Sequence, residues 1–166
     1  MSAPESDDDG RGQRGAETWP GRVAFWSGVV FALWHIWANT LGTLSELRAG
    51  VIHFAGFGFL CALLYPALHA RTPGGRRAVL ALDVALGLAA LSLGAYLFTQ
   101  EAEFYRRMTT TGFAPQDWIF TLLALALGIE FTRRTTGWII PVLIVLAFTY
   151  ITLWGRHVPG MLTFAG

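Results

Sequence analysis

Long apolar runs constrain this chain more than any other feature of its sequence. There are five of them, apolar at nearly every position, and the connections between them carry most of the charged residues. A run of about 20 such residues can cross the hydrocarbon core of a bilayer as a helix, where a helix satisfies its own backbone groups. The pattern predicts an all-α integral membrane protein with about five transmembrane helices. The expected spans are 23–44, 51–68, 78–98, 118–132 and 138–154.

The composition supports a membrane protein. Hydrophobic residues make up 54% of the 166-residue chain, and its mean hydropathy is +0.47. Charged residues make up only 14%, whereas an ordinary soluble domain has about 25%. The net charge of +1 gives no reason to expect nucleic acid as a partner.

Basic residues, all of them arginines, predict the orientation. Residues 1–22 are acidic, glycine-rich and polar, without a secretory signal, so they are expected to form a disordered cytoplasmic tail. This tail and the second and fourth connections carry eight arginines, against four in the other connections and the C-terminus. Cytoplasmic segments are enriched in arginine. The chain is therefore expected to be a multi-pass protein of the bacterial inner membrane, with its N-terminus inside.

A few polar residues lie within or beside the spans. Asp83 falls in the first two turns of the third span, where an acid is a functional candidate, although a salt bridge or a position near the helix N-terminus explains it equally well. His53 and His69 flank the second span on poorly matched faces, so they form a weak pair of haem ligands. His35 and Asn39 share a helix face, which predicts packing against another helix.

The densest cluster of charge and turn residues in the second half of the chain lies at 128–141. Glu130 precedes Arg133 and Arg134 by three and four residues, the spacing of helical ion pairs. The two arginines are expected to anchor the cytoplasmic side.

Three further residues of this cluster predict a tight connection between two helices. Gly137 is expected to end the first helix. Trp138 suits the boundary between lipid and water. Pro141 is expected in the first turn of the next helix, where its missing N–H leaves no partner unsatisfied.

Motifs for catalysis or cofactor binding are missing from the sequence. The histidines are isolated, Cys61 is the single cysteine, and no nucleophile elbow, phosphate-binding loop or dinucleotide fingerprint occurs. No enzymatic activity, cofactor or metal is therefore expected, and the chain is interpreted as one part of a larger membrane assembly.

Residues 130–141, Glu-Phe-Thr-Arg-Arg-Thr-Thr-Gly-Trp-Ile-Ile-Pro, resemble a segment of a known transporter family. The family is the fused permeases of tripartite ATP-independent periplasmic (TRAP) transporters of the TAXI type. A downstream turn at Pro159 and Gly160 is similar too, as is the early region from Arg48 and His53 to Leu-Tyr-Pro at 64–66. The resemblance covers most of residues 45–166. Phe131 departs from it, because a small residue is expected there.

The resemblance implies a small, Q-type membrane subunit, or the N-terminal part of a fused permease, because the fused relatives continue into a large permease domain. In that family the small part packs against the large permease part and widens its static scaffold. The large part binds the solute and sodium, and a periplasmic solute-binding protein delivers the solute, often a carboxylate. The implied partners are these two proteins and the lipid bilayer. The residues singled out above would then be structural or interface residues.

Two other functions remain open from the sequence. One is a membrane redox subunit with haem held by histidines, and the other is a scaffold for an unrelated membrane complex.

Overall fold

The computed structural model describes residues 13–110 and 112–150, and this part of the chain is all-helical. It forms helices α1 (Trp19–Thr40), α2 (Glu46–Leu64), α3 (Pro73–Thr109), α4 (Pro115–Thr136) and α5 (Ile139–Thr149). The all-α prediction is confirmed for the described residues.

Capping residues fix where the first three helices begin. The side-chain oxygens of Thr18, Ser45 and Thr72 each accept a hydrogen bond from a backbone N–H in the first turn, at 3.1–3.3 Å. Such caps satisfy donors that have no partner within the helix. Pro20 and Pro73 occupy the first turns of α1 and α3, where a missing N–H has no cost. The starts of these helices therefore include polar and small residues, which hydropathy alone does not assign to a membrane span.

The helices extend beyond the expected membrane spans. Helices α1 to α4 begin three to five residues before the expected spans, and α3 continues for eleven residues beyond the expected end at 98. Residues 99–109 were expected to form a polar connection. They stay helical because Glu103 pairs with Arg106 and Arg107 at 2.5 and 3.1 Å, the i,i+3 and i,i+4 spacings that support a helix.

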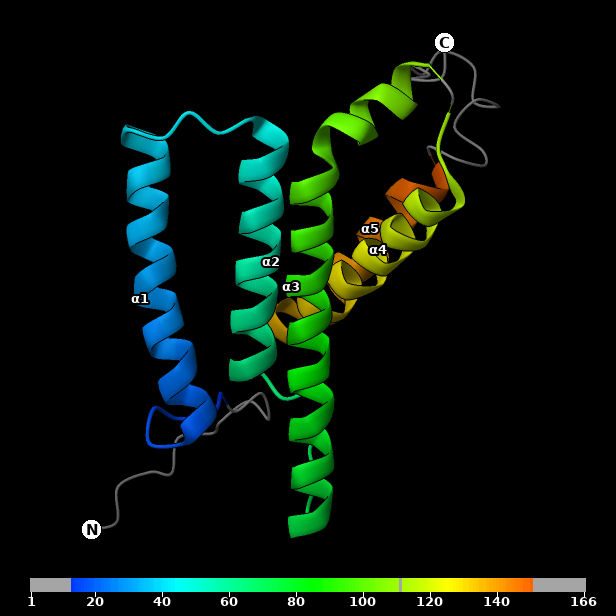
Figure 1. Cartoon of the computed structure of the whole chain (residues 1–166). Helices are drawn as coiled ribbons and strands as arrows, with labels where there is room; N and C mark the ends of the chain where they lie inside the picture. Colours follow the sequence, from blue (N-terminus) through cyan, green and yellow to red (C-terminus); the bar gives the residue numbers. More distant parts are fainter. Residues whose placement is uncertain (1–12, 111, 151–166) are drawn as a thin grey trace, which may run out of the picture.

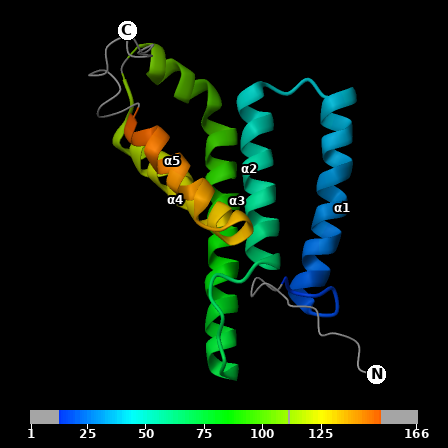
Figure 2. The ribbon, with the colours of Figure 1, turned by 180° about the vertical axis from the view of Figure 1, so that it is seen from behind.

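The helices run alternately up and down. Figure 1 shows α1, α2 and most of α3 side by side, while α4 and α5 form an antiparallel pair that leans away from α3. The reverse view in Figure 2 shows the same order. Among the described helices, α2 contacts α1, α3 and α4, whereas α1 contacts only α2 and α5 contacts only α4.

Small residues bring α2 and α3 together. Ala62 and Ala90 lie in one buried core with Leu93, Leu127 and Phe131, so this core joins α2, α3 and α4. Gly58 of α2 allows this close approach, because a Cβ added there would lie 2.7 Å from the Phe131 ring and 3.1 Å from the Ala90 Cβ.

Most large apolar side chains lie outside this core. In the part of the chain that the structure describes, two helices, α2 and α3, are long and apolar enough to cross a membrane. Helix α5 is apolar too, but only 11 of its residues are described. The five-span arrangement is therefore a proposal.

Candidate functional site

Five charged residues gather where α2 ends, close to the start of α3 and the end of α4. We call this group the ion cluster; it consists of Arg14, Asp83, Glu130, Arg133 and Arg134. Four of its members were singled out in the sequence. Arg14 was not, because it lies in the segment expected to be a disordered tail.

Asp83 lies at the centre of the ion cluster and is fully buried. Its Oδ1 accepts hydrogen bonds from Arg134 Nη1 at 2.8 Å and from the backbone N–H of Ala67 at 3.1 Å. Its Oδ2 accepts a hydrogen bond from Arg14. Both carboxylate oxygens are thus occupied by donors from three separate segments, as a buried charge requires. The salt-bridge explanation for this acid is the one that the structure shows.

Glu130 forms both of the ion pairs expected from its spacing. Its Oε2 accepts from Arg133 Nε at 2.8 Å, and its Oε1 accepts from Arg134 Nε at 2.9 Å. Arg134 therefore connects the two acids, and its side chain is only 1% exposed. Glu130 orients this buried guanidinium toward Asp83.

Arg14 and Arg134 also cap the C-terminal end of α2, and Arg133 binds a carbonyl of the connection that follows it. The last carbonyls of a helix have no intrahelical donors, and the negative end of the helix dipole favours cations. Helix α2 has no basic residue in its own last turn. The donor–carbonyl pairs are Arg14–Leu63 at 2.9 Å, Arg134–Tyr65 at 3.0 Å and Arg133–Ala67 at 3.1 Å.

The ion cluster holds helices in place, and the carboxylates of both of its acids are already paired. Each acid is surrounded by guanidinium donors, so neither is placed as a free base or nucleophile. Within the described residues, no group of three His, Cys, Asp or Glu side chains could hold a metal ion. The ion cluster therefore acts as a joint that fixes α4 against the end of α2 and the start of α3.

The turn residues next to the ion cluster form the connection between α4 and α5. Gly137 ends α4 with a φ of 76°, a conformation that glycine adopts easily. Trp138 is exposed, and the guanidinium of Arg133 lies 5.8 Å from its ring centroid. Pro141 is buried in the first turn of α5. Pro159 and Gly160 lie outside the described residues.

His53 has a partner that the sequence did not predict. His53 Nδ1 lies 3.0 Å from His35 Nε2, and His35 Nδ1 lies 2.9 Å from the carbonyl of Phe31. This places a polar contact between α1 and α2. His69 lies beyond the end of α2, in the connection to α3, so His53 and His69 do not come together. The pairing depends on the register between α1 and α2, which leaves no signal in the sequence.

Charged contacts also join the helices at the opposite end of the bundle. Arg107 binds both carboxylate oxygens of Asp117, at 2.9 and 2.8 Å, and thereby ties the end of α3 to the start of α4. This guanidinium, together with the backbone N–H of Ala114, lowers the pKa of Asp117. Arg48 lies 2.7 Å from Glu101 and so joins the start of α2 to α3. These pairs were missed because residues 99–117 were expected to form a loop.

Comparisons with known proteins identify no relative. No protein-family model matches the chain, and neither the curated proteins nor the solved structures contain a match.

Proposed function

We propose that this chain is a non-catalytic helical subunit of the bacterial inner membrane that supports a larger permease, as the small subunit of a TRAP-type transporter does. One observation carries the proposal: among the described residues, apolar side chains are exposed along the helices, while the charged groups are confined to the two ends of the bundle.

Exposed apolar residues cover the outer helices. Val30 and Ile36 of α1 are 67% and 63% exposed, and Ile139 of α5 is 74% exposed. Extended apolar surfaces of this kind mark contact with lipid or with another protein. Because α1 and α5 each contact one neighbour among the described helices, they have faces that remain available to lipid or to a partner.

Charges at the two ends differ in number and sign. Among the described residues, the end where α1 starts carries seven arginines and three acids, and the opposite end carries three arginines and four acids. The positive-inside rule then favours a cytoplasmic position for the end with more arginines. Five alternating helices would leave the chain outside after α5.

The 130–141 motif supports a subunit role through what its residues do here. Glu130, Arg133 and Arg134 hold α4 to the end of α2, and Gly137 turns the chain into α5. The motif that resembles the TRAP permeases is therefore a structural joint that positions α5. This is the behaviour expected of a scaffold rather than of a solute site.

Reporter fusions test the membrane arrangement. We expect a periplasm-active phosphatase to be inactive when fused after Gly75 and active when fused after Gly112, because α3 would cross the membrane between them. A cytoplasm-active fluorescent reporter at the same two sites should give the reverse result. Equal phosphatase activity at both sites would contradict a membrane crossing by α3.

Copurification tests the subunit role. A tagged chain isolated from detergent-solubilised native membranes is expected to bring down one large multi-span permease in a constant ratio. A chain that stops after Arg134 lacks α5 and should lose this partner while keeping the helical circular-dichroism signal of the remaining helices. Purification of the full chain alone, or with a haem Soret band, would contradict the proposal.

A further inference from the structure

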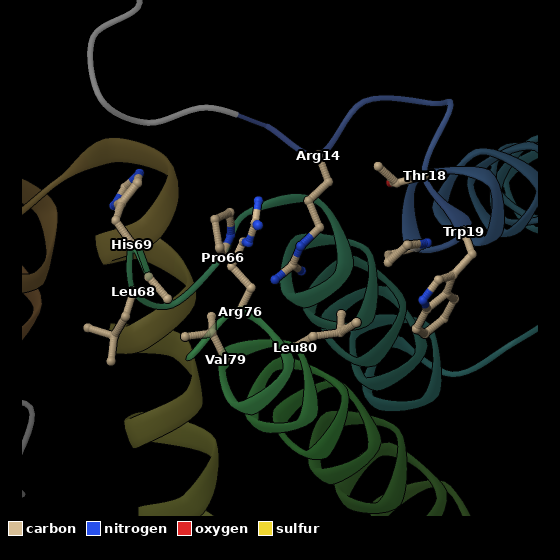
Figure 3. Close-up of a pocket in the computed structure, with 11 residues that line it drawn as sticks. Arg14, Thr18, Trp19, Pro66, Leu68, His69, Arg76, Val79 and Leu80 are labelled. Atoms are coloured by element: carbon tan, nitrogen blue, oxygen red, sulfur yellow. The ribbon is translucent and has the colours of Figure 1, made fainter. Parts of the chain in front are cut away.

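A pocket of about 410 Å³ lies at the arginine-rich end of the bundle. It is bounded by the start of α1, the connection between α2 and α3, and the first turns of α3 (Figure 3). We propose that this pocket binds the phosphate headgroup and the upper acyl chains of an anionic phospholipid. The inference rests on the membrane location proposed above.

Apolar side chains form most of the pocket wall. They come from all three bounding segments, and they include Trp19, Pro66, Leu68, Val79 and Leu80. Trp19 and Leu68 are 51% and 61% exposed, so their apolar surface is accessible to a ligand. Tryptophan is enriched at the level of lipid headgroups because its ring is apolar and its N–H is polar.

Positive charge is supplied by two arginines of the pocket. Figure 3 shows the Arg14 and Arg76 side chains between His69 on one side and Trp19 on the other. Arg14 is paired with Asp83. Arg76 is exposed, and among the described residues its side chain has no ion pair or hydrogen bond. None of the described residues that line the pocket is an acid. Its net charge therefore attracts an anion, and Arg76 is the residue with donors available for one.

A phospholipid fits this combination better than a soluble anion does. Inorganic phosphate could bind Arg76 but would leave the apolar walls exposed to water. A phospholipid brings a phosphodiester for the arginine and hydrocarbon for Trp19 and Leu80. Basic pockets between helices on the cytoplasmic side bind anionic lipid headgroups, and this is the side that the arginine count favours.

Two neighbouring arginines provide a matched test. Arg76 and Arg77 are both exposed, and neither has an ion pair among the described residues, but only Arg76 lines the pocket. We expect Arg76→Gln to weaken binding of phosphatidylglycerol to the full-length chain by about fivefold, the effect of one arginine near an anionic lipid. The Arg77→Gln variant should bind phosphatidylglycerol as tightly as the unaltered chain does. Native mass spectrometry of the detergent-purified protein, titrated with phosphatidylglycerol or phosphatidylcholine, measures both.

Three outcomes would overturn the lipid site. They are equal weakening by both substitutions, equal binding of the two lipids, and displacement of phosphatidylglycerol by millimolar inorganic phosphate. The last would show a site for a free anion. Leu68→Glu places a carboxylate at the pocket wall, and it should weaken phosphatidylglycerol binding without altering the helical circular-dichroism signal.

The test separates this inference from the proposed function. Recovery of the chain from the cytosol without detergent would contradict the membrane location itself. If the chain instead requires detergent and copurifies with a permease, while the two arginine variants bind phosphatidylglycerol equally well, this result would contradict only the lipid site.

Discussion

Replacing Asp83 with alanine is expected to destabilise the helical bundle by about 3–5 kcal/mol, the cost of removing one partner of a buried ion pair. The substitution removes one of the two acids that pair with Arg134, whose side chain is 1% exposed and cannot turn into water without moving α4. It also removes the acceptor of Arg14 and of the Ala67 N–H. Thermal unfolding followed by tryptophan fluorescence in detergent measures the loss of stability. The unfolding temperature should fall by roughly 2–4 °C for each kcal/mol.

Glu17→Gln is the matched control for this prediction. Glu17 lies at the same end of the bundle, is exposed, and has no ion pair among the described residues. Its substitution should change stability by no more than about 0.5 kcal/mol. A double variant, Asp83→Asn with Arg134→Gln, should lose less stability than the two single variants lose together. Each single variant already breaks the contact that the two residues share. If Asp83→Ala and Glu17→Gln unfold at the same temperature, the ion cluster does not hold the helices together.

The ion cluster links stability to the proposed role. Arg134 and Arg133 hydrogen-bond to the carbonyls of Tyr65 and Ala67, just after α2 ends. Helix α4 is thereby fixed, and α5 follows it after the turn at Gly137. Loss of Asp83 should therefore release α5 as well, and with it the exposed surface that we propose for a partner permease.

Local spacing explains what could be predicted from the sequence. The pairs of Glu130 with Arg133 and Arg134 follow from one turn of helix, and the end of α4 follows from Gly137. The helix starts were missed because Thr18 and Thr72 stabilise the first turns through hydrogen bonds, which hydropathy does not register. The extension of α3 beyond residue 98 was missed for a similar reason, since charged residues continue a helix when they pair along it.

Contacts between distant segments explain what could not be predicted. Arg134 and Arg14 are 51 and 69 residues from Asp83 in the sequence. The sequence offered a salt bridge as one explanation for Asp83, but it did not indicate which of the arginines would form it. His35 and His53 face each other only because α1 and α2 pack in one register. Among the described residues, therefore, contacts within one helical turn could be predicted, but contacts between segments far apart in the sequence could not.

Gly94→Leu is expected to separate α2 from α3 and to cost about 3 kcal/mol or more, at the upper end for an overpacked core. A Cβ at Gly94 would lie 2.6 Å from the Cβ of Ala55, closer than two carbons can approach, and Ala55 is only 6% exposed. A short alanine side chain cannot rotate away, so the helices themselves must move apart.

Gly50→Leu is the control, because Gly50 is an exposed position of α2 where an added Cβ would meet no atom within 4 Å. Removing that glycine should be neutral or stabilise α2 by up to about 1 kcal/mol. Unfolding midpoints in detergent distinguish the two, and equal midpoints for both variants would show that α2 and α3 do not pack this closely at Gly94.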